Sequence, residues 1–245
     1  MLTESTSSST IYTKEMPENS GSTPDKNNYN NKVFIVDKPL DFTSTDVVRI
    51  FKKNFHLDKI GHAGSLDPKA TGLLILCSGI LTKQIDKYMD MEKEYSGIFR
   101  IGATTKCFDT EGTEENNVDT NHIEEKEIQK VKNSFIGEIE QIPPMYSALK
   151  HKGRPLYKLA RNGDTIERKP RKILIKEFDV KLLNESEVFF RVVCSKGTYV
   201  RVIANDFGDK LGVGAYLKEL RRTRIGEYTL ESLDQEIKGI KFKIL

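Results

Sequence analysis

The stretch from Gly61 to Leu74 reads Gly-His-Ala-Gly-Ser-Leu-Asp-Pro-Lys-Ala-Thr-Gly-Leu-Leu and predicts a tight loop that runs into a buried strand. Its three glycines favour sharp backbone turns. Asp67 is its only carboxylate, and Pro68 biases Asp67 towards an extended backbone. The apolar residues 73–77 follow and are typical of a buried strand. The stretch therefore holds one acid on an anchored loop, although an Asp-Pro pair is also typical of a simple side-chain-to-backbone turn.

Composition narrows the class of protein. The chain has 245 residues, of which 37% are hydrophobic, and no apolar run has the length of a membrane helix. The three cysteines, Cys77, Cys107 and Cys194, are scattered and lack metal-ligand spacing. An odd number of isolated cysteines favours a reducing compartment over a disulfide framework. We therefore expect a cytoplasmic protein without a bound metal.

The net charge of +3 is unevenly distributed along the chain. Residues 150–172 contain nine basic and two acidic side chains, whereas residues 109–127 contain eight acids and one lysine. Such asymmetry favours a focused positive surface that binds a polyanion. A solvated lysine-rich surface with no ligand is the alternative interpretation.

The pattern of apolar residues predicts one folded domain over residues 32–245, preceded by a disordered tail. Residues 1–31 are rich in Ser, Thr and Asn and cannot bury enough apolar surface to offset chain entropy. Strands and helices then mix without strict alternation, which favours an α+β fold with a largely antiparallel central sheet flanked by helices. We expect strands at 33–36, 73–77, 95–101, 173–183 and 188–194, and helices at 43–55, 82–89, 123–135, 155–162 and 200–211.

A second candidate cluster lies at the expected strand-to-helix junction of residues 197–201. Tyr199 and Arg201 could reach a cleft that they share with Asp67, because an arginine fork is a natural partner for a carboxylate. The alternative for Arg201 is a surface position in a first helical turn. Tyr95, on an expected strand, is a third candidate, although a strand tyrosine alone more often packs in a core.

These residues carry a resemblance to a known family. The stretch 61–72 resembles the catalytic motif of the tRNA pseudouridine-55 synthase (TruB) family, and further blocks follow in the family's order. The chain differs at Asp41, where relatives usually have glycine, and there we expect a local adjustment of a turn. The other matching blocks are 37–39, 94–95, 141–150, 154–163, 197–201 and 220–224.

The resemblance implies an isomerase that converts the uridine at position 55 of the tRNA T-loop to pseudouridine, without a cofactor. It makes Asp67 the essential acid, either as a nucleophile or as a base. It also implies that Tyr95 stacks on the uracil, that Tyr199 lies against it and that Arg201 pairs with Asp67. Because the target base is buried in the folded loop, it must flip into a pocket.

The resemblance gives supporting roles to a further set of residues. Leu220 would line the pocket, Lys38 and Pro39 would support the catalytic loop, and His62 would help to hold the T-loop. Residues 143–172 would form an RNA-gripping insertion that includes Lys152, Arg154 and Lys158. We expect a monomer that contacts the T-stem-loop of tRNA, with no membrane, no obligatory protein partner and no C-terminal RNA-binding (PUA) domain. The alternative is a non-catalytic tRNA-binding module that keeps this fold.

Overall fold

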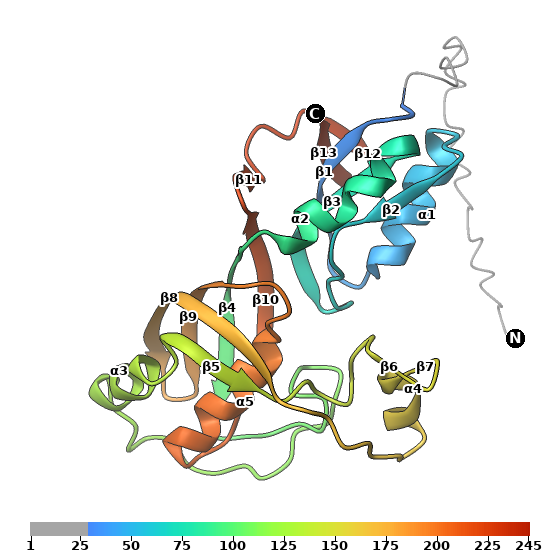
Figure 1. Ribbon diagram of the computed structural model, residues 1–245. Helices are drawn as coiled ribbons and strands as arrows, with labels where there is room; N and C mark the ends of the chain where they lie inside the picture. Colours follow the sequence, from blue (N-terminus) through green and yellow to red (C-terminus); the bar gives the residue numbers. More distant parts are fainter. Residues whose placement is uncertain (1–28) are drawn as a thin grey trace, which may run out of the picture.

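The computed structural model describes residues 29–245, so the predicted tail lies almost wholly outside the described range. Figure 1 shows a single twisted sheet that runs through the molecule, with helices packed against its two halves. Eleven strands make up this sheet, and its main path is β12-β13-β1-β3-β10-β4-β9-β8-β5. Every pairing along this path is antiparallel except that of β3 with β10. The predicted α+β class with a largely antiparallel sheet is therefore confirmed.

The elements have the following bounds. The strands are β1 (Val33–Lys38), β2 (Ile60–His62), β3 (Ala70–Ser78), β4 (Lys93–Ile101), β5 (Gly137–Gln141), β6 (Lys150–His151), β7 (Arg154–Pro155), β8 (Arg171–Asn184), β9 (Glu187–Cys194), β10 (Ala215–Ile225), β11 (Tyr228–Thr229), β12 (Gln235–Ile237) and β13 (Ile240–Ile244). The helices are α1 (Ser44–Asn54), the 3-10 helix η1 (Gly79–Gln84), α2 (Ile85–Asp90), α3 (Glu125–Asn133), α4 (Leu156–Arg161) and α5 (Val200–Leu211). No helix within the described residues 29–245 is long and apolar enough to cross a membrane.

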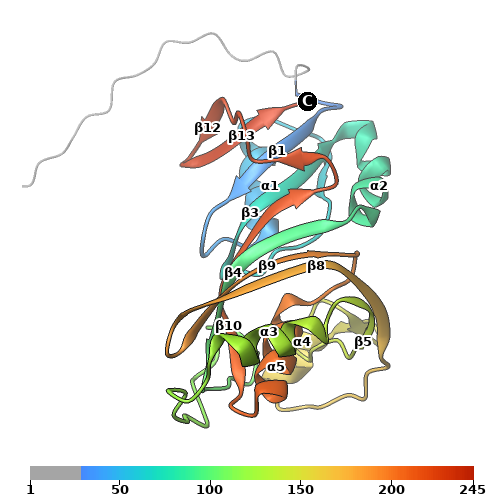
Figure 2. The same cartoon turned by 90° about the vertical axis from the view of Figure 1, so that its left-hand side faces the viewer.

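The half of the sheet drawn uppermost in Figures 1 and 2 is covered on both faces. Helix α1 begins at Thr43, whose hydroxyl and backbone form a reciprocal capping box with Asp46. Its apolar side packs on one face, where Phe51 lies edge-on to Phe34 and Phe242. The other face of β1 and β3 belongs to a separate cluster covered by η1 and α2. Both faces of β3 are therefore buried, which explains its unbroken apolar run.

The other half of the sheet carries α3 and α5 on one face. Apolar side chains of these helices pack on β4, β8, β9 and β10, and Phe99 stacks on Phe190 with ring centroids 4.2 Å apart. Helix α5 spans the predicted residues and ends at Gly212, which takes a left-handed backbone with φ of 78°. Its first turn points at the junction between the two halves of the sheet, so the junction receives the side chains that begin this helix.

Strand β10 joins the two halves because it pairs with β3 on one side and β4 on the other. The sequence analysis assigned no element to this segment. One row of register partners crosses the junction from Lys38 to Gly72, Arg222 and Tyr95. Gly72 has a φ of 103°, and a Cβ atom there would collide with the backbone of Arg222. The close approach of β3 and β10 therefore requires glycine at this position.

A small lobe lies apart from the sheet in Figure 1 and contains the β6–β7 hairpin and α4. It interrupts the chain between β5 and β8, within the predicted insertion at residues 143–172. Two backbone hydrogen bonds secure its base, from Leu156 N to Leu149 O and from Tyr157 N to Ser147 O, at 2.7 and 3.0 Å. We call residues 150–161 the basic lobe.

The Gly72 contact gives a stability prediction. Gly72→Ala adds both a disfavoured φ and a collision with the Arg222 backbone, so we expect a loss of more than about 3 kcal/mol of unfolding free energy. Gly239→Ala is the matched control, since Gly239 has a φ of 76° but open space around it. The control should lose only about 1 kcal/mol. Urea unfolding measures both, and equal losses would contradict the close-approach explanation.

Candidate active site

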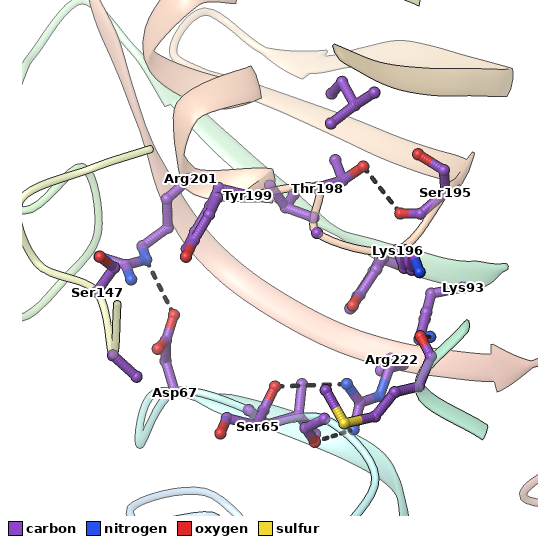
Figure 3. Close-up of a pocket in the computed structure, with 18 of the residues that line it drawn as sticks. Ser65, Asp67, Lys93, Ser147, Ser195, Lys196, Thr198, Tyr199, Arg201 and Arg222 are labelled. Carbon is purple, nitrogen blue, oxygen red and sulfur yellow. Dashed lines mark hydrogen bonds and ion pairs between the residues drawn. The ribbon is translucent and has the colours of Figure 1, made fainter. Parts of the chain in front are cut away.

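A cavity of about 640 Å³ opens where the two halves of the sheet meet. Figure 3 shows its walls, which come from parts of the chain that are far apart in sequence. The loop 64–67, strand β4, the segment 147–149, the loop 195–199, the start of α5 and strand β10 each contribute side chains. The sequence clusters at residues 61–72 and 197–201 are thus brought into one site.

Asp67 and Arg201 form an ion pair at the floor of this cavity. Arg201 Nε lies 2.9 Å from Asp67 Oδ2, and the Arg201 side chain is 6% exposed whereas that of Asp67 is 45% exposed. The carboxylate therefore faces the cavity while its partner is held inside the protein. The interpretation of Arg201 as a surface residue was wrong, because its guanidinium points inwards from the first turn of α5.

Arg201 is fixed by a network of its own. Its Nη1 donates to the carbonyl of Cys107 at 3.0 Å, and its Nη2 donates to that of Tyr146 at 2.7 Å. A second carboxylate, Asp109, lies 3.4 Å from Nε and is itself buried. The sequence analysis did not single out Asp109, because it is only one of the eight acids in residues 109–127. With this many partners, the guanidinium has a single orientation in which to hold Asp67.

The surroundings act on the pKa of Asp67 in opposite directions. Desolvation within the cavity raises the pKa of the carboxyl, the Arg201 guanidinium lowers it, and the nearby charge of Asp109 raises it. Together these effects raise the pKa of Asp67 above the usual value for an aspartate. The exposed part of the carboxylate reaches the cavity solvent, so the carboxyl keeps access to water. A raised pKa makes the group a better base than an ordinary aspartate.

Arg222 holds the backbone of the loop that carries Asp67. It is 1% exposed, and it donates from Nε to Leu73 O at 2.7 Å, from Nη2 to Gly64 O at 3.2 Å and from Nη1 to Ser65 O at 3.4 Å. The sequence analysis did not single it out among the arginines at 221, 222 and 224. Only the register of β10 shows which of them faces the loop.

Tyr95, Tyr199 and Leu220 line the cavity, as the resemblance implied for Leu220. Tyr199 is positioned by Gln141, which accepts from the Tyr199 amide at 2.8 Å and donates to its carbonyl at 3.0 Å. Burial raises the pKa of Tyr95, and Arg222, next to it on β10, opposes this shift. The cavity is thus bordered by two tyrosines and a leucine.

Lys38, Pro39 and His62 do not line the cavity. Lys38 is fully buried, and its Nζ donates to the carbonyls of Phe42 at 2.6 Å and Pro39 at 2.9 Å, with a long contact of 3.4 Å to Pro68. Burial lowers its pKa to about 8. This position behind the loop fits a supporting role. His62 is half-buried on β2, and burial, with a smaller effect of Arg222, lowers its pKa.

Asp41 takes the turn that glycine usually provides. Its φ is 64°, its amide donates to Pro68 O at 2.9 Å and its carboxylate lies 2.7 Å from Lys69 Nζ. The expected local adjustment is therefore a left-handed aspartate. Lys152, Arg154 and Lys158 lie in the basic lobe, away from the cavity lining, and their side chains are exposed.

Comparison with known proteins gives the family. The model of the TruB family pseudouridylate synthase N-terminal domain matches residues 52–200, and that of the tRNA pseudouridylate synthase B C-terminal domain matches residues 201–237. Curated relatives named tRNA pseudouridine synthase B include one from Clostridium tetani, 48% identical over 82% of this chain and 70% of its own length. Another, from Flavobacterium johnsoniae, is 44% identical over 82% of this chain and 91% of its own.

Solved structures agree with this result. A chain from the crystal structure of a Cbf5-Nop10-Gar1 complex is 30% identical with a TM-score of 0.66, over 88% of this chain and 58% of that one. An H/ACA RNP bound to a substrate RNA containing 2'-deoxyuridine is 26% identical with a TM-score of 0.63, over 88% of this chain and 57% of that one. This chain thus spans less than two thirds of these solved chains. The chain belongs to the TruB family of pseudouridylate synthases and is an enzyme of that family.

The charges around Asp67 give a prediction that needs no substrate. Arg201→Gln removes the group that lowers the pKa of Asp67, so we expect this pKa to rise further. Carbon-13 NMR of labelled aspartate carboxyls measures it. Lys196→Gln is the control, because Lys196 lies on the cavity wall but pairs with Asp90 instead. A pKa that stays unchanged or falls in the Arg201 variant would contradict the assigned electrostatics, provided that thermal melting shows both variants folded.

Proposed function

We propose that this chain isomerises the uridine at position 55 of tRNA to pseudouridine, with Asp67 as the essential acid. The observation that carries the proposal is the half-exposed Asp67 carboxylate, which Arg201 holds at 2.9 Å on the floor of a cavity lined by two tyrosines. The curated relatives of the chain are named tRNA pseudouridine synthase B, and the chain covers most of the length of each one described above.

The proposed reaction moves one glycosidic bond within one nucleotide. The bond between uracil N1 and ribose C1′ breaks, the ring turns, and a bond forms between C5 and C1′. The C5 proton then leaves, and N1 gains a proton. Asp67 acts at the sugar, either as a nucleophile on C1′ or as a base, because a carboxylate can take either role near neutral pH.

The other cavity residues position the flipped nucleotide. Tyr95 stacks on the uracil in place of the lost neighbouring bases, and Tyr199 and Leu220 close the cavity around it. Arg201 keeps Asp67 ionised and oriented. Lys38, Pro39 and Arg222 keep the catalytic loop in place from behind. His62 contacts the T-loop outside the cavity. A site that is rigid before binding loses little free energy to reorganisation during the reaction.

The basic lobe, with Lys152, Arg154 and Lys158, binds phosphates of the T-stem-loop. These three side chains are exposed. The lobe that carries them stands apart from the sheet (Figure 1), and we infer that a helical RNA stem docks on it. We further propose that the protein acts as a cytoplasmic monomer, without an obligatory protein partner and without a cofactor. The domain that does this work is the catalytic domain over residues 32–245.

Single-turnover release of tritium from C5-labelled uridine tests the function. Unmodified tRNA incubated with excess protein should release tritium, and mapping of the modified nucleotide should locate it at position 55. Tight binding without release would favour the alternative of a non-catalytic tRNA-binding module. Release from another position would keep the reaction but correct the target.

Asp67→Asn should abolish turnover, because an amide can neither attack C1′ nor accept a proton as the carboxylate does. The affinity for tRNA should stay within a few-fold, since phosphate contacts dominate it. Tritium release and filter binding measure the two quantities. Arg201→Ala should also be severe, and the double variant should be little worse than Asp67→Asn alone, because residues acting as a unit are not additive. Activity of Asp67→Asn within about tenfold of wild type would overturn the assignment.

Replacing Lys152, Arg154 and Lys158 with Gln should weaken tRNA binding through lost counterion release. The slope of log affinity against log salt should flatten by up to about two to three units if each side chain meets one phosphate. Turnover at saturating tRNA should change less, because Asp67 lies elsewhere. Thermal stability should hardly move, since exposed charges contribute little. An unchanged salt slope would show that the lobe is only a solvated surface.

A further inference from the structure

The lining of the cavity is much richer in cations than in carboxylates. Within the described residues it holds six cationic side chains and two carboxylates. One carboxylate is that of Asp67, which pairs with Arg201, and the other is that of Asp90, the last residue of α2. This balance favours an anionic ligand such as RNA, so the second carboxylate needs an explanation. The six cations are Lys93, Arg171, Lys172, Lys196, Arg201 and Arg222.

Asp90 forms an ion pair with Lys196 at the opening of the cavity. Asp90 Oδ1 lies 2.8 Å from Lys196 Nζ, although the two residues are 106 positions apart in the sequence. Their side chains are 62% and 63% exposed and both line the cavity, which places the pair at its mouth. Figure 3 shows Lys196 on the side of the cavity away from Asp67 and Arg201. The pair therefore joins α2, on one half of the sheet, to the loop 195–199, on the other.

The backbone next to each member of the pair is held in place. Lys93 Nζ donates to the carbonyl of Met91 at 2.6 Å, directly after Asp90. Ser195, directly before the lysine of the pair, exchanges two hydrogen bonds with Leu174. Its amide donates to Leu174 O and its Oγ accepts from the Leu174 amide, each at 2.9 Å. The lysine can therefore change its partner by rotation of its side chain alone.

Bound RNA brings a competing partner to this position. When one nucleotide flips into a cavity, its base and sugar enter, while the phosphates on either side stay at the mouth with the rest of the chain. The ammonium of Lys196 is an exposed cation at this mouth, and phosphate is a strong acceptor for it. An exposed ion pair contributes little to stability in water, so exchanging Asp90 for a phosphate costs little free energy.

We propose that Lys196 binds an RNA phosphate at the mouth of the cavity, and that this phosphate displaces Asp90, which holds Lys196 in the free protein. Asp90 is then a competitor of the RNA for one cation, and it lowers the affinity of the site. The proposal rests on the proposed function, because it needs a nucleotide that flips into the cavity, but it does not need the isomerisation step.

The test measures binding of a T-arm stem-loop at low salt in an Asp67→Asn background, so that the RNA is not converted. Asp90→Asn should raise the affinity about three- to tenfold, because it frees Lys196 and removes a repelling charge. Lys196→Gln should weaken binding and flatten the slope of log affinity against log salt by about one unit. An affinity that does not rise in Asp90→Asn, or an unchanged slope in Lys196→Gln, would overturn the proposal.

Asp86→Asn is the matched control. Asp86 lies one turn earlier on α2 and is exposed, but it does not line the cavity. The control changes the net charge by the same amount as Asp90→Asn, and it should leave the affinity within about twofold because salt screens distant exposed charges. Equal gains in the two variants would show an effect of net charge alone and would overturn the exchange.

The exchange also predicts coupling between the two residues. Asp90→Asn should gain less affinity when Lys196→Gln is already present, because no cation is left to be freed. A gain of the same size or larger in that background would show that Asp90 acts only through its own charge, and would overturn the displacement. Thermal melting should match wild type in every variant, since the pair is exposed. Tritium release by the protein with Asp67 intact tests the proposed function separately: the expected binding changes without release would support this proposal and reject the isomerisation.

Discussion

The buried guanidinium of Arg222 is the interaction on which the site depends. A cation that is 1% exposed has lost its water, and no carboxylate of the described residues forms an ion pair with it. The carbonyls of Gly64, Ser65 and Leu73 take the place of that water. An uncompensated buried charge would cost several kcal/mol, so the loop must stay wrapped around the guanidinium. The backbone that leads to Asp67 is thus fixed before any RNA binds.

A second arginine, on a different element, performs the complementary task. Arg222 comes from β10 and restrains the loop backbone, whereas Arg201 comes from α5 and restrains the Asp67 carboxylate itself. The two restraints meet because β10 pairs with β3 through Gly72, which has no side chain to hold the strands apart. Asp67 is therefore not a turn residue that satisfies its own backbone. Its position comes from long-range contacts, as preorganised catalysis requires.

The limits of sequence reasoning follow from the same geometry. Helix α5 carries a local signal, a glycine stop, and was predicted correctly. The glycine-rich acid motif was predicted as a loop over residues 61–72, but the loop is shorter, because strand β2 ends at His62 and strand β3 begins at Ala70. Strand β10 was missed because its charged middle, residues 218–224, lacks a clear apolar alternation, and pairing with β3 and β4 supplies what local preference does not. Arg222 and Asp109 were missed for a related reason: register and burial distinguish them from their neighbours, and neither is visible in a single sequence.

The segment 145–149 links the basic lobe to Asp67, the proposed catalytic acid. Tyr157, at the start of α4, donates to the Ser147 carbonyl, and Arg201 donates to the carbonyl just before it. The basic lobe and the guanidinium that orients Asp67 are therefore attached to the same short run of backbone. Binding free energy gained far from the reacting bond accelerates a reaction only when it is used to improve geometry at that bond. Here the path for such use consists of two hydrogen bonds to neighbouring carbonyls and the ion pair of Arg201 with Asp67.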